Sequence, residues 1–481
     1  MLTVNEIQQF IGDDIASQLK HDAREGERYY DGLNDILQYR MFYYNADGEI
    51  VEDKTRSNMK IPHLFYRELV DQGTQYMLSD TDMIKSDIPE LQDILDEYFN
   101  NNQDFIAELT EAVTGCQRSG YSYMYAYRNA DNKISFQCAD SIGVVEVRAN
   151  DTDSDADHVI YWYNDRLAKS NKIIKRIQVW DAQNVYFYVQ DNEGVIVPDD
   201  SEKLNPRPHT LYKRDKKVLY KGFGFIPFFR LDNNKKKLSN LKPIKALIDD
   251  YDLMASSLSN NLVDFDTPLH VVKGFEGDNF DELQTNLKTK KIIGVGDEGD
   301  VDVKTVNVPY EARVAKLELD EKNIYRFGMG LNTAGLKDTS ATTNIAIKAA
   351  YSLLDLRCSQ LEIRLKQFLN KLVKVVLDDV NQTEVKDYQL KDVYYSFTHN
   401  IMSNAVENAQ IELTNAQKQQ TAITTLLNIA QRLDNETLMQ LICEQLDISY
   451  EDIKDKLPDI NEADNSINSA MQTLKDVNID E

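Results

Sequence analysis

Cysteine is scarce in this chain, with four residues among 481. They are widely separated and form no CxxC pair; they stand at positions Cys116, Cys138, Cys358 and Cys443. A zinc ribbon or a disulfide framework needs closely spaced cysteines, so neither is expected. We interpret the four as unpaired thiols of a protein kept in a reducing compartment.

The sequence also lacks an apolar run long enough to cross a bilayer. Its first residues, Met1 to Glu6, do not show the basic-then-apolar pattern of a signal peptide. We therefore expect synthesis in the cytosol and no membrane contact. Hydrophobic residues make up 42% of the chain, which is enough for a substantial core, and the length suggests about two to four domains.

Basic residues are outnumbered, since 54 Lys and Arg face 80 Asp and Glu and leave a net charge of −26. Tight binding to nucleic acid needs several cations on phosphates, so the composition argues against it. The charge is explained either by simple solubility or by a surface past which DNA must slide without sticking. The composition alone does not choose between these.

A glycine motif resembles a dinucleotide-binding loop but has the wrong context. Gly294 to Gly299 matches GxGxxG, yet Asp297, Glu298 and Asp300 would repel a phosphate. The residues that follow alternate like a strand and not like a helix. We therefore predict a glycine-rich turn and no bound cofactor.

Metal-binding and catalytic patterns are missing as well. Four alternating acids resemble the start of a calcium loop (Asp151, Asp153, Asp155 and Asp157). Ala156 replaces the required glycine and Trp162 occupies the position of the bidentate Glu, so we predict a solvated acidic loop. The histidines show no ligand spacing (His21, His63, His158, His209, His270 and His399). Without a P-loop, a GxSxG elbow or HExxH, the sequence predicts no metal, no cofactor and no enzyme.

Residues up to about 240 alternate between helical and strand periodicity, which predicts an α+β region. A helix is expected from Val4 to Leu19, with Thr3 and Glu6 as its capping box, and Asp47-Gly48 suits a hairpin turn. Further helices are predicted near 62–78 and 104–119. Strands are predicted at 121–127, 135–138, 144–147, 159–163, 173–180, 185–189 and 225–231.

Beyond residue 240 the pattern becomes mainly helical. A helix opened by Pro243 precedes a mixed insert with strands at 269–272, 291–295 and 301–308 and a short helix at 281–287, and a second helix begins near Pro309. After a polar break, a long helix runs from Asn344 to Val380. Its apolar positions alternate by four and three, which indicates packing against other helices (Leu354, Cys358, Leu361, Leu365, Phe368, Leu372 and Val375). Helices are also predicted at 402–433, 436–446 and 451–457.

These segments resemble the portal, or head-to-tail connector, proteins of tailed phages that infect Gram-positive bacteria. The resemblance rests on the helix from Ile61 to Leu78, where Leu64 replaces the usual Asn, and on the Gly-aromatic strand from Gly120 to Tyr127. Its most specific part is Gly222-Phe-Gly-Phe-Ile-Pro-Phe-Phe229. The following pieces complete it: Asn233-Asn234, Ser239, Leu241, Leu247-Ile-Asp-Asp-Tyr-Asp252, Ser256-Ser257, Asn260-Asn261 and Asp264-Phe265.

The resemblance implies an α+β, mainly helical portal fold, assembled as a cyclic ring. The implied parts are a wing at 1–240, a first stem helix at 241–263, a clip at 264–308, a second stem helix at 309–329, a tunnel loop at 330–343, the wing's spine helix and strand at 344–399, crown helices at 400–458 and a flexible acidic tail at 459–481.

The resemblance also implies a function. The expected protein forms a twelve-subunit ring, thirteen-subunit in some isolated rings, at one capsid vertex of the virion, after assembly in the host cytoplasm. Through it, double-stranded DNA is packaged and ejected without sequence preference. The expected partners are the terminase large subunit, a head-completion protein, the major capsid protein and the scaffolding protein.

Two groups of site residues are predicted within that frame. Polar side chains of the tunnel loop would face DNA: Asn332, Lys337, Asp338, Thr339 and Asn344. A basic cluster in the clip would meet the motor: Lys288, Lys290 and Lys291. Both groups have an ordinary alternative as solvated charges or local ion pairs.

Two other classes of protein stay open on the sequence alone. One is a non-viral helical scaffold or adaptor with an α+β head, which would not assemble as a ring with a central hole. The other is a nuclease or nucleotide-binding enzyme, for which the sequence offers no carboxylate, histidine or P-loop cluster.

Overall fold

The fold is described from a computed structural model, which covers residues 2–45, 47–54, 56–149, 156–166, 173–190, 194–214, 217–265, 269–275, 295–304, 310–333, 344–399, 405–433, 435–446 and 450. The chain divides into two compact units. The first holds Met1–Gly335 and Lys348–Ile401, and the second holds Leu336–Ile347 and Met402–Glu481. In the described part, no helix combines the length and apolarity that a membrane span requires.

The N-terminus forms two helices where the sequence predicted one. Helix α1 spans Val4–Ala16 and α2 spans Gln18–Tyr30. The predicted capping box is present, since Thr3 accepts from the backbone of Glu6 and the Glu6 side chain accepts from the backbone of Thr3. Ser17 breaks the helix because its backbone is extended and its hydroxyl caps α2 through the amide of Lys20. The helical spacing of apolar residues continues across this break, so periodicity could not reveal it.

An antiparallel hairpin follows a 3-10 turn at Asp35–Gln38. Its strands are β1 (Phe42–Tyr44) and β2 (Ile50–Glu52), joined by the predicted turn at Asp47-Gly48. An extended stretch then leads to α3 (Phe65–Met77), which begins three residues after Pro62. The helix starts late because residues 57–63 are held extended by hydrogen bonds from alternate backbone amides to side chains of another helix.

Helix α5 (Gln103–Ser119) covers a three-stranded sheet of β14 (Phe228–Asp232), β4 (Tyr121–Arg128) and β5 (Ile134–Ala139). Before it come β3 (Ile84–Lys85), α4 (Pro89–Leu95) and a π-helical turn at Asp96–Asn100. Gly120 ends α5 in the left-handed region, with φ +92°, and turns the chain directly into β4. The predicted strand at 225–231 begins only at Phe228, because Phe223 and Phe225 belong to an aromatic loop before it.

A second sheet has the antiparallel order β10-β9-β8-β7-β6, with β11 also paired to β9. The strands are β6 (Val144–Val147), β7 (His158–Arg166), β8 (Ile173–Trp180), β9 (Asn184–Gln190), β10 (Ile196–Pro198) and β11 (Arg207–Pro208). A separate hairpin joins β12 (Thr210–Arg214) to β13 (Lys217–Lys221). Ile7 and Ile11 of α1 pack into the core of the second sheet. The predicted α+β character of this region is confirmed.

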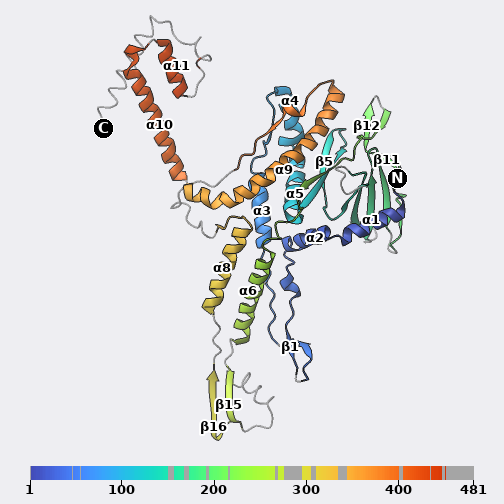
Figure 1. The fold of residues 1–481 in the computed structure, drawn as a ribbon, viewed down its shortest axis with the longest axis vertical. Helices are drawn as coiled ribbons and strands as arrows, with labels where there is room; N and C mark the ends of the chain where they lie inside the picture. The colour runs from blue at the N-terminus through green and yellow to red at the C-terminus, as the bar shows by residue number, and fades with distance from the viewer. Residues whose placement is uncertain are drawn as a thin grey trace. The chain divides into compact units, whose positions relative to one another are not determined.

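Two helices and an insert form the next part of the chain. Helix α6 (Lys245–Phe265) and helix α8 (Tyr310–Phe327) lie side by side (Figure 1). Between them in the chain, β15 (Leu269–Phe275) pairs with β16 (Val295–Lys304). The glycine motif was predicted as a turn, and this was wrong for its described residues: from Val295 onward they form β16. Regular pairing with β15 covers residues 300–304, and the register shifts between Lys273 and Phe275, so Gly296 and Gly299 lie in an irregular part of the strand, where glycine is common.

The long helix α9 runs from Asn344 to Glu384, slightly beyond its predicted end. All seven predicted seam residues, from Leu354 to Val375, are buried within this single chain. Tyr395 of the short β17 (Tyr394–Tyr395), which pairs with β3 after a 3-10 turn at Leu390–Asp392, donates to Asn370 of α9 at 2.9 Å. The seam therefore packs against the chain's own body.

The second unit contains α10 (Ala405–Asn428) and α11 (Asn435–Gln445), separated by a 3-10 turn at Ala430–Arg432. The sequence predicted one helix at 402–433, but the helix ends before Ile429, where the tighter turn takes over. The predicted helices at 281–287 and 451–457 and the acidic loop at 151–155 lie outside the described residues.

Candidate functional site

The pair α6 and α8 is antiparallel, because residues at the start of α6 pack with residues at the end of α8. Ile244 and Ile248 share one core cluster with Ile324 and Tyr325. The cluster continues into α2 and α3 through Tyr29, Tyr66, Leu69 and Val70. Packing with α2 and α3 therefore fixes the ends of the two helices that carry the β15–β16 insert.

Ion pairs add to this packing. Lys316 of α8 contacts Asp250 of α6 at 2.5 Å, and it also pairs with Asp320 of its own helix. These two hydrogen-bonded carboxylates raise the pKa of Lys316. Because Lys316 is partly exposed, solvent screens the pairs and their net contribution to stability is small. The ion pair between Lys316 and Asp250 therefore connects the two helices but adds little to the free energy of unfolding.

One face of α6 carries a ladder of polar side chains that binds an extended segment of the chain. Every fourth side chain of α6 accepts a hydrogen bond from every second backbone amide of the segment. The amide of Ser57 donates to Asp264 at 3.1 Å and that of Met59 to Asn260 at 2.7 Å. The amide of Ile61 donates to Ser256 at 3.1 Å and that of His63 to Asp252 at 2.9 Å. Four helical residues rise by about 6 Å, and two extended residues advance by about 6.6 Å. The two repeats therefore match, and we call this set the α6 ladder.

Asp252 is the buried end of the α6 ladder. Its carboxylate is fully buried and accepts from Asn34 at 2.6 Å, from the amide of His63 and, at 2.7 Å, from the His63 ring nitrogen Nδ1. A buried carboxylate is tolerated only when hydrogen bonds replace its hydration. Asp252 thus joins three segments: α6, the turn after α2 and the extended segment that ends two residues before α3.

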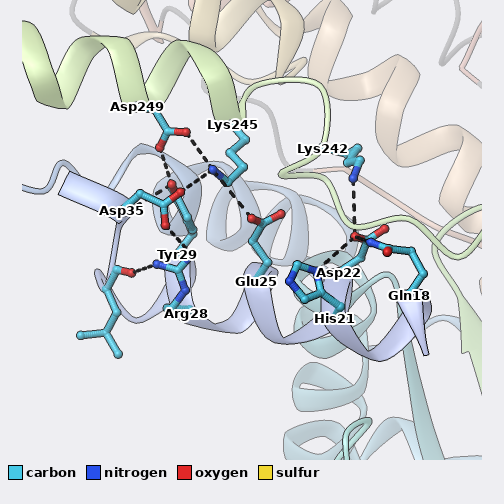
Figure 2. A network of polar contacts seen from close by, with 11 residues as sticks. Gln18, His21, Asp22, Glu25, Arg28, Tyr29, Asp35, Lys242, Lys245 and Asp249 are labelled. Atoms are coloured by element: carbon cyan, nitrogen blue, oxygen red, sulfur yellow. Dashed lines mark hydrogen bonds and ion pairs between the residues drawn. The ribbon is translucent and has the colours of Figure 1, made fainter. Parts of the chain in front are cut away.

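A second polar network connects α2 to the start of α6 (Figure 2). Lys245 contacts Asp35 at 2.6 Å, Asp249 at 2.8 Å and Glu25 at 3.7 Å, while Tyr29 donates to Asp249. Burial alone would lower the pKa of Lys245, but the hydrogen bonds to Asp249 and Asp35 outweigh it and raise the pKa. Burial raises the pKa of Tyr29, and its bond to Asp249 adds to the effect. Lys245 therefore stays charged at any physiological pH.

The chain that leaves α8 is held by α3 and α9. The Gln72 amide forms two hydrogen bonds with the backbone of Leu331: Nε2 donates to its carbonyl at 2.9 Å and Oε1 accepts from its amide at 3.0 Å. Arg357 of α9 donates to the carbonyls of Gly328 at 2.9 Å and Leu69 at 2.8 Å. Burial lowers the pKa of Arg357, whose charge faces the negative end of the α8 dipole.

The predicted loop residues fall partly within the described structure. Asn332 donates to Glu321 of α8 at 3.1 Å, so this amide nitrogen is bound within its own chain. Asn344 is the first residue of α9. Lys337, Asp338 and Thr339 lie outside the described residues, as do Lys288, Lys290 and Lys291 of the predicted docking cluster. The roles proposed for all eight remain predictions.

Sequence reasoning missed Gln72 and Arg357, which fix the start of the loop. Neither has a local signal, because a single Gln or Arg on a helix ordinarily faces solvent. The α6 ladder did have a signal in the sequence. Polar residues recur there every four positions, which places them on one helical face (Asp252, Ser256, Asn260 and Asp264). Within the described ranges, no group of three His, Cys, Asp or Glu side chains is arranged to hold a metal ion.

Comparison with known proteins adds an independent result. The family described as phage portal protein, SPP1 Gp6-like, matches residues 13–459. The portal protein of Bacillus phage SPP1 is 26% identical over 388 residues, which cover 80% of this chain and 76% of that protein. The portal protein of Clostridium phage phiCD119 is 25% identical over 425 residues, covering 85% and 89% of the two chains.

Proposed function

Since the chain belongs to the SPP1 Gp6-like family of phage portal proteins, we propose that twelve copies form a ring at one vertex of the capsid. Double-stranded DNA enters and leaves the head through its centre. The observation that carries this proposal is the antiparallel pair α6 and α8 with its β15–β16 insert, in a chain whose family match runs from residue 13 to 459. A ring of this kind uses heterologous contacts that close after a fixed rotation.

In this proposal α6 and α8 are stem helices in the channel wall, and residues 264–308 are the clip. The clip binds the terminase large subunit during packaging and the head-completion protein afterwards. The crown, residues 400–458, faces the capsid interior, and the outer wing contacts the major capsid and scaffolding proteins. The protein itself catalyses nothing, and the terminase supplies the energy for translocation.

The loop at 330–343 is the part proposed to touch DNA. Contacts that accept every sequence must go to phosphates, and contacts that permit movement must be weak. The net charge of −26 supports this, because an acidic ring does not hold a polyanion tightly. The anchors at Gln72 and Arg357 give the loop a fixed base at Leu331 and Gly328.

Electron microscopy of the purified protein tests the proposed assembly. We expect class averages along the symmetry axis to show closed rings with a central hole and cyclic symmetry. Single particles without a hole, or open filaments at every protein and salt concentration, would contradict the proposal and favour a scaffold or adaptor.

A charge reversal in the loop tests the contact with DNA. Lys337→Glu is expected to leave ring formation unchanged and to alter the length of the packaged genome, because it removes one phosphate attraction per subunit. The measurement is the size of DNA extracted from filled heads. Lys236→Glu, a reversal at an exposed side chain far from the loop in the sequence, serves as the matched control and should package DNA of normal length. Packaged DNA of normal length in the Lys337 variant would exclude the role of this side chain.

A further inference from the structure

The β1–β2 hairpin is well formed but exposes nearly all of its apolar side chains. Phe42 is 58% exposed, Tyr43 50%, Tyr44 72% and Ile50 65%. Its turn is nonetheless regular, since Asn45 binds the backbone of Asp47 and Glu49. Two-stranded hairpins are only marginally stable in water unless something covers them. This hairpin is formed, yet its apolar side chains stay exposed in the described part of the chain.

The exposed area is large for a feature of this size. Strand residues alternate between faces, so Phe42, Tyr44 and Ile50 lie on one face of the hairpin, and Tyr43 and Val51 lie on the other. The first face presents roughly 350 Å² of apolar surface, since one aromatic side chain alone offers about 150–250 Å². That area lies within the range of the largest apolar patch of a typical monomer, about 300–600 Å², and is more than a third of one partner's share of a standard interface, about 800 Å². Patches of this kind mark interaction surfaces.

The hairpin is also held in place at its base. Lys60 donates to the carbonyl of Leu37 at 3.0 Å. This bond connects the segment that precedes β1 to the segment that follows β2. The returning chain is bound to α6 through the α6 ladder, and Asn34 before the hairpin donates to Asp252. A surface that is fixed before binding loses less conformational entropy when it docks. The position of the hairpin is therefore fixed by the rest of the fold before any partner binds.

We propose that the β1–β2 hairpin docks on a second copy of this chain and forms part of the contact between neighbouring subunits. This rests on the proposed ring. A ring contact is heterologous, so each copy must carry a projecting patch that differs from the patch receiving it. The hairpin meets that requirement, because both of its strands are edges and, in the described part of the chain, no other strand pairs with either.

Charge favours a second copy of the chain over DNA as the partner of the hairpin. Copies with a net charge of −26 repel one another, so their contacts must be made by surfaces with little charge. The six strand residues of the hairpin include one charged side chain, Glu52, which lies 4.0 Å from Arg40. DNA, a polyanion, gains nothing from an apolar patch. A second copy of the same acidic chain can make contact through this weakly charged patch without adding to the repulsion between the copies.

A triple substitution tests the proposal. Phe42→Ser, Tyr44→Ser and Ile50→Thr remove apolar surface that is exposed within the chain, so thermal unfolding should change little. We expect the protein concentration needed for half-assembly, measured by mass photometry, to rise at least tenfold. The control is Ile173→Ser with Val197→Ser, which removes apolar groups that are 60% and 41% exposed from β8 and β10. The control should assemble as the parent chain does.

The outcomes separate this inference from the proposed function. If the parent chain never assembles, the proposed ring fails. If the parent forms rings and the triple variant forms them equally well, the ring stands and the hairpin contact is wrong. If the control loses assembly as strongly as the triple variant, the effect is not specific to the hairpin and the inference is also overturned.

Cross-linking identifies the partner directly. Tyr44→Cys is labelled with a benzophenone maleimide and irradiated, with the parent chain labelled in parallel because Cys138 is only partly buried. We expect covalent dimers that link the hairpin to a different segment of another copy, as read by mass spectrometry of isotope-mixed subunits. Cross-links found only within one chain would mean that the chain covers its own hairpin, and this result, like the absence of any cross-link, would overturn the proposal.

Discussion

Asp252→Ala is expected to destabilise the protein by about 3–5 kcal/mol, because it removes a buried acceptor that serves three hydrogen bonds. The donors are the Asn34 amide, the His63 backbone amide and the His63 ring. A buried donor left unsatisfied costs about 1–3 kcal/mol, so three would cost about 3–9 kcal/mol. The lower part of this range is expected, because the His63 ring is only partly buried and Asn34 keeps its bond to the His63 carbonyl. We expect a lower unfolding temperature and faster hydrogen exchange at the amide of His63.

Asn260→Ala is the matched control for Asp252→Ala. It removes another acceptor of the α6 ladder, but an exposed one, where water replaces the lost bond to Met59. Its cost should stay below about 1 kcal/mol. Equal costs for the two variants would show that burial of Asp252 does not determine its contribution. Because a chain of several units does not unfold in one step, exchange at individual amides is the more direct measurement.

Gly120→Ala is expected to cost about 2–5 kcal/mol, for two separate reasons. Gly120 has φ +92°, where a side chain costs about 1–2 kcal/mol. A methyl group there would also overlap the backbone of Lys237 and Leu238, which cannot rotate away as a side chain could. Forcing that backbone apart costs about 1–3 kcal/mol more. The variant should unfold at a lower urea concentration, with the loss centred on α5, β4 and β14.

Gly224→Ala separates these two contributions. Gly224 has φ +82°, nearly the same as Gly120, but a methyl group there meets nothing within 4 Å. It should show only the conformational part of the cost, about 1–2 kcal/mol. If Gly224→Ala and Gly120→Ala were equally destabilising, the close approach of the 237–238 backbone would have no energetic role.

The glycine motif shows where local reasoning fails. Gly294 to Gly299 predicts a turn by composition, yet its described residues belong to β16. The pairing partner, β15, begins 26 residues earlier in the chain; it pairs with Val295 and with residues 300–304 on either side of the motif, and so carries the strand through a register shift. Ser17 shows the reverse: the apolar spacing continues from Val4 to Leu19, but a local cap divides the helix. In both places the sequence carries two conflicting signals, and the structure follows the one that the prediction did not use.

What the sequence determined by itself were the properties that repeat along the chain or arise from neighbouring residues. The α6 and α8 helices, most strands before residue 232, the hairpin turn at Asp47-Gly48 and the acidic balance follow from period, turn chemistry and composition. The family resemblance rests on the same local order of residues, and the match over residues 13–459 confirms it.

Only the tertiary structure decided which polar groups meet. Asp252 pairs with residues 189 and 218 positions away, and Gln72 and Arg357 reach backbone groups 259 and 29 positions away. Such pairs leave no periodic trace, because a single buried hydrogen bond needs only one suitable side chain on each segment. The uncovered hairpin belongs here too: its apolar strands predict burial, and only the fold shows that this chain's described residues leave them exposed.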